Sequence, residues 1–326
     1  MRIAVDAMGG DRAPGEVVRG AAAASTELGV QVTVVGQPAS VQSLLDPYPQ
    51  LSFHPATQVI EMDEHPAQAV RSKQDSSISV CARLCRDREA DAWVSAGNSG
   101  AVMAAALLIQ GRIRGIERPA LGTIVPSGDG PCYVLDVGAN VDARPEHLVQ
   151  FAVMGAVFAG QVLRRRPPRV ALLANGEEGS KGNQLVQTVH ERLRADRHAF
   201  DFVGNVEPKE VLAGHADVVV TDGFAGNVFI KTAEATAELL LGILREQIPR
   251  TARGKVGGLL IRPSVGRIRS SIDWREFGGA PLLGIDGVAV VAHGRSDARA
   301  ITNAIRVASQ AQHTALADRI REALAQ

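Results

Sequence analysis

Strand-length apolar runs alternate with helical patterns along the 326-residue chain, and this alternation limits the folds that it can adopt. The apolar runs predict strands at residues 3–6, 30–35, 51–54, 92–94, 170–174, 202–204, 218–221 and 288–293. Helical patterns separate them at residues 14–28, 66–90 (broken near 74–77), 101–109, 145–165, 183–194, 227–248 and 297–325. Such alternation predicts a mainly parallel sheet with helices on both faces, which is a three-layer α/β/α fold. A hairpin of residues 120–125 and 132–136 is the one antiparallel element expected.

The bulk composition excludes several classes of protein. No repeat or low-complexity linker divides the chain, so residues 1–326 are expected to form a single α/β unit. The formal net charge is zero and aromatic residues make up 4%, which argues against nucleic acid as a partner. No apolar run reaches the length of a bilayer, and the first residues enter a strand directly, so we expect no signal peptide. The three cysteines lack metal-site spacing, and we interpret them as buried apolar residues in a reducing cytoplasm.

The loops that follow the predicted strands share a composition. Nearly every one combines glycine with asparagine, aspartate or serine, and the opposite strand ends do not. These loops are residues 6–11, 95–100, 136–142, 175–183, 204–205, 222–227 and 293–296. Ligands of such folds bind beyond the carboxyl ends of the strands. The one-sided distribution therefore predicts one polar crevice lined by backbone N–H groups.

The turn after the strand at residues 92–94 is the strongest single candidate for an anion site. It holds two glycines and three small polar residues: Ser95, Gly97, Asn98, Ser99 and Gly100. The first N–H groups of the following helix have no partner within it, and the glycines would let a ligand approach them. A tight turn capped by Ser99 is the structural alternative.

Several catalytic motifs are missing from this pattern. The chain has no Gly-x-Gly-x-x-Gly after its first strand, no Walker motif, no Gly-x-Ser-x-Gly elbow and no Cys or Ser with an evident His partner. Hydride transfer, nucleotide hydrolysis and a covalent acyl-enzyme are therefore disfavoured. An anion that itself attacks a carbonyl, such as inorganic phosphate, fits a site of this kind, because it needs placement and an oxyanion donor.

Seven motifs run along the chain in order: DAMGGD (6–11), SAGNSGA (95–101), DVGANVD (136–142), GEE with KGN (176–183), DGFAGN (222–227), GGAPLLG (278–284) and HG (293–294). Together they cover essentially the whole chain and resemble the phosphate acyltransferase (PlsX) family of bacterial phospholipid synthesis. The resemblance implies conversion of fatty acyl-[acyl-carrier protein] and inorganic phosphate into acyl phosphate and free carrier protein. It also implies a homodimer without a cofactor, with a fold like phosphotransacetylase and the isocitrate and isopropylmalate dehydrogenases.

Other readings of the same residues stay open. One is a phosphotransacetylase that acts on acyl-coenzyme A, and another is a non-catalytic scaffold that binds the membrane surface and carrier protein. An NAD-dependent hydroxy-acid dehydrogenase is more distant. The family resemblance favours a cytoplasmic enzyme that contacts the inner face of the membrane and the membrane glycerol-3-phosphate acyltransferase there.

The candidate site residues come from the polar loops. A catalytic role is predicted for Lys231, His293, Asp222 and Lys181. Phosphate or substrate binding is predicted for Asp6, Gly9, Gly10, Asp11, Ser95, Gly97, Asn98, Ser99, Gly100, Asp136, Gly138, Asn140, Asp142, Gly176, Glu177, Gly223, Gly226 and Asn227. No metal site is predicted, because oxygen ligation cannot be told from turn chemistry in these loops.

Each charged candidate has a plainer interpretation. Lys231, expected in the first turns of a helix, opposes the helix dipole unless a phosphate offsets the cost, but it could be a surface lysine. His293 either packs at a strand end or protonates the leaving thiolate. The aspartates could cap turns, bind Mg²⁺ or position a lysine. Glu177 or Glu178 is expected to pair with Lys181.

Residues 247–271 have a different character. They include six basic residues and no acidic one, interleaved with an apolar patch at residues 256–261, and they fit no strand of the predicted sheet. We expect an excursion from the α/β unit. An ordinary loop or a dimer contact is as consistent with the pattern as a surface for carrier protein or anionic lipid.

Overall fold

The computed structural model describes residues 1–272 and 274–325, and their strands form one 11-stranded sheet in the order β3-β2-β1-β4-β11-β10-β5-β6-β9-β7-β8. The strands are β1 Arg2–Asp6, β2 Gln31–Gly36, β3 Ser52–Pro55, β4 Ala92–Ser95, β5 Ala120–Ser127, β6 Gly130–Leu135, β7 Arg169–Leu173, β8 Asp201–Val206, β9 Val218–Val220, β10 Ala280–Leu283 and β11 Ala289–Val291. The helices are α1 Gly15–Leu28, α2 Pro38–Leu45, α3 Pro66–Ser72, α4 Ser77–Arg86, α5 Ser99–Ala105, η1 Ala106–Gln110, α6 Pro145–Gln161, α7 Gln184–Ala195, α8 Pro208–Ala213, α9 Gly223–Gln247, η2 Ile248–Arg250, α10 Ala252–Ile272, α11 Trp274–Phe277, α12 Ala298–His313 and α13 Leu316–Leu324.

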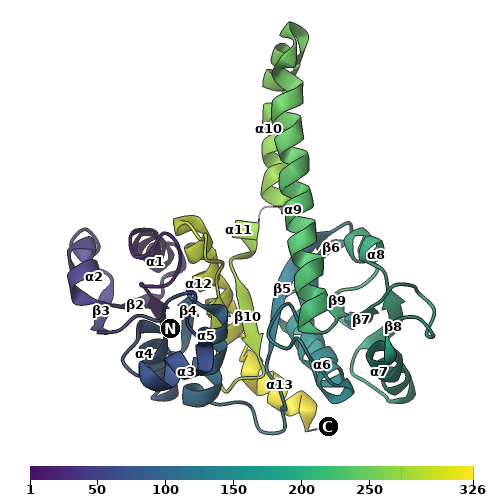
Figure 1. Ribbon diagram of the computed structural model, residues 1–326, viewed down its shortest axis with the longest axis horizontal. Coiled ribbons are helices and arrows are strands. Elements are labelled where there is room, and N and C mark those ends of the chain that lie inside the picture. Colours follow the sequence, from purple (N-terminus) through teal and green to yellow (C-terminus); the bar gives the residue numbers. More distant parts are fainter. Residues whose placement is uncertain (273, 326) are drawn as a thin grey trace.

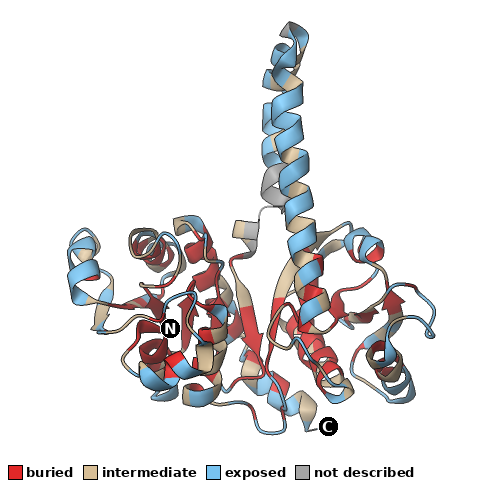
Figure 2. Cartoon of the chain, viewed as in Figure 1, coloured by how far each residue is buried: buried red, intermediate tan, exposed pale blue. Residues whose placement is uncertain are grey.

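Helices cover both faces of this sheet, and each face has its own apolar core (Figures 1 and 2). Successive residues of one strand enter different cores: Ile3 and Val5 of β1 lie in one, and Ala4 lies in the other. This is the period-two alternation of a strand that is buried on both faces. The expected three-layer α/β/α fold is therefore confirmed.

Strand direction divides the sheet into two groups. β3, β2, β1, β4 and β11 are mutually parallel, and so are β6, β9, β7 and β8. Three antiparallel pairings, β11–β10, β10–β5 and β5–β6, separate the groups, so the two groups run in opposite directions. The hairpin is thus not the one antiparallel element, because β10 was missed: it is four residues long and contains Pro281, which a strand pattern disfavours.

This topology corrects the prediction of a single crevice at one edge. The loops after β1, β4 and β11 leave one edge of the sheet, whereas the loops after β6, β9 and β7 leave in the opposite direction. Residues of the two sets meet only where another element connects them. Helix α9 is that element, as the site geometry below describes.

Most helices lie where the sequence predicts them, with two kinds of exception. The pattern at residues 297–325 forms two helices, because Ala315 takes a left-handed conformation with φ 49° between α12 and α13. Short α2 and α8 were not predicted, although each begins at a proline, which is favoured at the first helical position.

The segment at residues 247–271 was also not predicted to be helical. It forms η2 and most of α10, which lies beside the outer half of α9 and rises with it away from the layers (Figure 1). Most of its described side chains are exposed (Figure 2). The side chains of residues 252 and 268–274 lie outside the described ones, and Arg269 is among them. No helix in the described part of the chain has both the length and the apolar character needed to cross a membrane.

Candidate functional site

The β1–α1 and β4–α5 loops pack backbone to backbone. The hydroxyl of Ser95 donates to the Asp6 carboxylate at 2.6 Å and accepts the Gly97 N–H at 3.1 Å. A Cβ on Gly9 would lie 2.5 Å from the Gly97 nitrogen, so neither loop leaves room for a side chain there. Asp6 is buried, and burial raises its pKa against the hydrogen bonds that it accepts. Gly9 and Gly97 are therefore needed for the close packing of these two loops, and their predicted role in ligand binding stays a prediction.

The start of helix α5 is the part of this turn that stays open. Asn98, and not Ser99 as expected, is the N-cap residue, and its side-chain oxygen accepts the Ala101 N–H at 3.1 Å. Gly100 lies against Pro66 of α3. Ser99 and Gly100 are the first two residues of α5, so their main-chain N–H groups have no partner within the helix, and Ser99 is exposed. Two donors at a helix N-terminus are thus available to an anion.

The β11–α12 loop closes over the β1–α1 loop. The Asp11 N–H donates to the Gly294 carbonyl at 2.8 Å, and Gly10 makes a close approach to the same carbonyl with a positive φ of 102°. A glycine is required at that position for both reasons. The loop thus places His293 beside Asp11.

Helix α9 brings further charges to His293. Arg295 pairs with Glu238 of α9 at 3.6 Å, which fixes the helix against the loop. Lys231 and Asp11 both lie close enough to His293 to affect its titration. Asn227, Lys231, Glu234 and Glu238 follow one another at helical spacing, so they share one face of α9 toward this loop.

Burial, with the positive charges of Arg295 and Lys231, lowers the pKa of His293 below its usual 6.5. The imidazole is therefore neutral at pH 7. Its Nδ1 accepts the Arg295 N–H at 3.1 Å, which assigns the ring proton to Nε2. A neutral imidazole in this tautomer can donate from Nε2 to a carbonyl oxygen, and it is a weaker acid for a leaving thiolate than an imidazolium.

The N-terminus of α9 is closed by the protein itself. Asp222 accepts the N–H groups of Phe224 and Ala225 at 3.0 and 2.8 Å. The Gly223 N–H donates to the Asn140 carbonyl at 2.7 Å, and the Gly226 N–H donates to the Asp222 carbonyl. Asp222 therefore acts as a cap. Lys231 lies in the third turn, where the helix dipole acts weakly, so the dipole argument for it fails.

Asp136 fixes the loop after β6 in the same way, because its carboxylate accepts hydrogen bonds from main-chain N–H groups of that loop. Its carboxylate is fully buried and accepts the N–H groups of Leu121, Gly138, Ala139 and Asn140, together with the Asn140 side chain. No oxygen of Asp136 faces a ligand in this arrangement, and burial raises its pKa. Asp142, by contrast, is exposed.

Two contacts join this loop to α9. The Asn227 side chain donates to the Val137 carbonyl at 2.9 Å and lies against Gly138. Gly226 packs so closely on the Asp136 carbonyl that no side chain fits. Asn227 precedes Lys231 by one helical turn, so the two sets of polar loops meet along α9.

The β7–α7 loop stands apart. No hydrogen bond or ion pair between described residues links Lys181 to His293 or Lys231, and the stem of Lys181 lies over Gly176. Neither Glu177 nor Glu178 forms the expected ion pair with Lys181 among the described residues. A hydrogen bond with Glu210 and the charge of that carboxylate raise the pKa of Glu177 instead. The loop is closed by Asn175, whose oxygen accepts the Gly182 N–H at 2.8 Å.

No side chain at the site is an activated nucleophile among the described residues. Burial raises the pKa of Cys132 to about 12 and that of Cys81 well above its usual value. Ser95 is buried and donates to Asp6, without a histidine at its oxygen. The thiolate or alkoxide that covalent catalysis requires is thus unavailable here.

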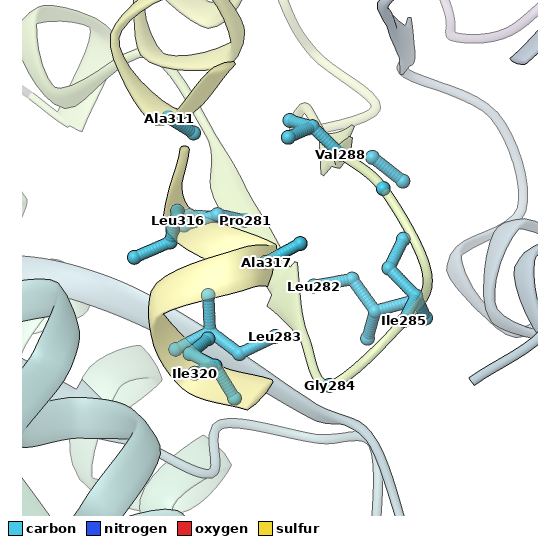
Figure 3. Close-up of a pocket in the computed structure, with 12 residues that line it drawn as sticks. Pro281, Leu282, Leu283, Gly284, Ile285, Val288, Ala311, Leu316, Ala317 and Ile320 are labelled. Atoms are coloured by element: carbon cyan, nitrogen blue, oxygen red, sulfur yellow. The ribbon is translucent and has the colours of Figure 1, made fainter. Parts of the chain in front are cut away.

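Sequence reasoning missed Arg295, Glu234 and Glu238, which surround His293 and Lys231. The helical spacing from Lys231 would have found the two glutamates. The small pocket of Figure 3 is elsewhere: it measures about 10 Å³ and lies between β10 and α13, with an apolar lining. A void of that size holds no more than about one water.

The fold is the one found in phosphotransacetylases. Among solved structures, a phosphotransacetylase from Streptococcus pyogenes aligns with TM-score 0.60 and 19% identity, covering 95% of this chain and 94% of that one. A branched-chain phosphotransacylase from Enterococcus faecalis aligns with TM-score 0.62 and 14% identity, covering 96% and 99%. At such identities the likeness establishes the fold alone.

The sequence comparisons are closer. A family model described as "Fatty acid synthesis protein" matches residues 1–319. The phosphate acyltransferase of Nostoc punctiforme is 48% identical, covering 98% of this chain and 96% of that protein. That of Anaeromyxobacter dehalogenans is 49% identical, covering 99% and 90%. The chain belongs to the phosphate acyltransferase family and is an enzyme of that family.

Proposed function

We propose that this enzyme converts fatty acyl-[acyl-carrier protein] and inorganic phosphate into acyl phosphate and free carrier protein. A phosphate oxygen attacks the thioester carbonyl carbon, a C–O bond forms, and the C–S bond breaks. The carrier thiolate leaves and takes up the proton that phosphate releases. Membership of the phosphate acyltransferase family and the phosphotransacetylase-like fold support this reaction.

One observation carries the mechanism: open anion donors lie in loops that reach a neutral His293, with no activated nucleophile beside them. The N–H groups of Ser99 and Gly100 would hold the phosphate, and Lys231 would balance its charge. The Nε2–H of His293 would stabilise the oxyanion that forms on the thioester carbonyl. Placement then supplies most of the rate, because phosphate is already nucleophilic.

The test is release of free thiol from palmitoyl-[acyl-carrier protein] with and without phosphate, with palmitoyl-coenzyme A in parallel. We expect phosphate-dependent release and a higher kcat/KM for the carrier-protein donor. A preference for the coenzyme A donor would establish the phosphotransacetylase alternative. No release from either donor would leave the scaffold alternative.

We also propose a homodimeric enzyme in the cytoplasm that docks on the inner face of the membrane. The outer half of α9 exposes Leu239, Leu240, Ile243 and Leu244, and α10 exposes Val256, Leu259 and Leu260. Apolar surface of this extent marks an interaction site. A second copy of the chain would cover the apolar residues of α9. The basic residues of α10 would face the anionic lipid of the membrane and the glycerol-3-phosphate acyltransferase in that membrane.

A further inference from the structure

We propose that Met62 is a specificity-determining residue that contacts the acyl chain of the donor, an inference that rests on the proposed function. Met62 lies in the segment at residues 57–64, between β3 and α3, and this segment follows a strand of the first parallel group. Met62 is 55% exposed, although hydrogen bonds from other parts of the chain fix the backbone of its segment.

Two polar side chains from outside this segment donate hydrogen bonds to its main-chain carbonyl groups. The amide nitrogen of Asn98 donates to the carbonyls of Glu61, Met62 and Glu64 at 3.1–3.2 Å. The ammonium of Lys73 donates to the Val59 carbonyl at 2.7 Å and pairs with the Glu64 carboxylate. Both amide hydrogens of Asn98 are thus used within the protein, so this residue positions the segment instead of binding an anion.

The upstream end is tied down as well. The hydroxyl and N–H of Thr57 donate to the Asp75 carboxylate at 2.6 and 2.9 Å, and Ile60 is buried in the core. With Ile60 turned inward and both ends fixed, Met62 is presented outward on a rigid backbone.

Met62 reaches the site from this position. A Cβ atom added to Gly294 would lie 3.7 Å from the terminal methyl of Met62 and 3.8 Å from the Asp11 carboxylate. Met62 therefore supplies an apolar contact at Gly294, the residue after His293, and its flexible thioether suits acyl chains of varied conformation.

The experiment compares Met62→Glu, Met62→Ala and the conservative Met62→Leu, with Leu212→Glu on α8 as an exposed control. Steady-state rates are measured with acetyl and palmitoyl donors at saturating phosphate, together with the KM for phosphate. We expect Met62→Glu to lower kcat/KM for the palmitoyl donor on the order of 10-fold. The acetyl donor, the KM for phosphate and the melting temperature should change little, and Met62→Leu should restore the palmitoyl rate.

Equal loss for both donors, or no loss for either, would overturn the inference. A binding measurement separates it from the proposed reaction. S-hexadecyl pantetheine, a thioether that cannot react, should bind the wild type more tightly than Met62→Glu even if phosphate releases no thiol. Equal binding by the two proteins would refute the role of Met62 while leaving the reaction intact.

Discussion

Three aspartates at strand ends, Asp6, Asp136 and Asp222, each hold the loop that follows them. A short carboxylate can accept several backbone N–H groups of the next turn, which is why this residue is favoured there. Turn-capping was one of the interpretations open from the sequence, and for Asp136 and Asp222 it is the one that the hydrogen bonds support. Hydrogen bonds within the protein therefore fix the conformation of these loops.

Asp136 should matter to stability more than its exposed neighbour. Asp136→Ala leaves buried N–H groups without an acceptor, and we expect a loss of about 3 kcal/mol in the free energy of unfolding. Urea unfolding measures it. Asp142→Ala is the matched control and should leave the midpoint unchanged. A similar small effect from both variants would mean that water replaces the carboxylate.

The charges around His293 should govern its titration. Removing a positive neighbour makes the imidazolium less unfavourable, so Arg295→Met and Lys231→Met should each raise the pKa of His293, while Asp11→Asn should lower it further. Chemical shifts of the ring measure these values.

The pH dependence of kcat/KM should shift in the same direction as the pKa of His293. Protonation of His293 removes the acceptor at Nδ1, so kcat/KM should fall as the pH drops through a value below 6.5. In Lys231→Met that acid limb should move to higher pH. An acid limb that stays in place while the ring pKa moves would assign it to another group.

At the scale of elements, α9 has three parts with different roles. Its first turn is closed by Asp222, its middle presents Lys231 and Glu234 to the β11–α12 loop, and its outer half is exposed. Burial raises the pKa of Glu234. One helix therefore connects the catalytic candidates to the surface at α10.

That surface predicts reversible, salt-sensitive binding to vesicles of anionic phospholipid. Leu260 is 75% exposed, and each basic residue near an anionic surface contributes on the order of 1 kcal/mol. Leu260→Glu, or joint replacement of Arg262, Arg267 and Arg269 by glutamine, should reduce co-sedimentation.

The matched control replaces Arg71, Arg194 and Arg197, which are exposed elsewhere, and should sediment like the wild type. If the α10 variants bind vesicles and carrier protein as well as the wild type does, the segment has neither role. A change in dimer mass in those variants would assign it to the contact between copies instead.

At the scale of the whole molecule, two parallel groups of strands that run in opposite directions are joined by β10 and β5. The polar loops of both groups meet at α9, and we propose that residues 1–326 act as one unit around it. Among the described residues near this junction, Cys132 and Ser95 are buried, while the N-terminus of α5 offers open anion donors.

This arrangement predicts direct transfer to phosphate. With a radiolabelled acyl donor and no phosphate, rapid quenching should trap no acyl group on the protein, and Cys132→Ala should keep the wild-type turnover. A labelled peptide containing Ser95 or Cys132, formed as fast as turnover, would require a two-step mechanism. Asn175→Ala, in the separate β7–α7 loop, is the control variant for this experiment because it lies outside the junction.

The sequence alone determined the order of elements, the three-layer class and the family. These follow from short-range signals: apolar period, glycine-rich turns after strands, and motifs of six or seven residues. It also identified nearly all residues of the polar loops. What it could not give was the packing of these loops, since only the structure shows how closely Gly9 and Gly97 approach each other.

Only the tertiary structure decided strand direction, which loops meet, and which carbonyl groups Asn98 binds. Each of these depends on contacts between distant residues, such as the bond from Ser95 to Asp6 across 89 positions and that from Asn98 to Glu61 across 37. A β10 strand of four residues reverses half of the sheet, and nothing local in its sequence signals that. Pairing of this kind is settled by the free energy of the whole packed sheet, because an isolated strand has no preferred partner.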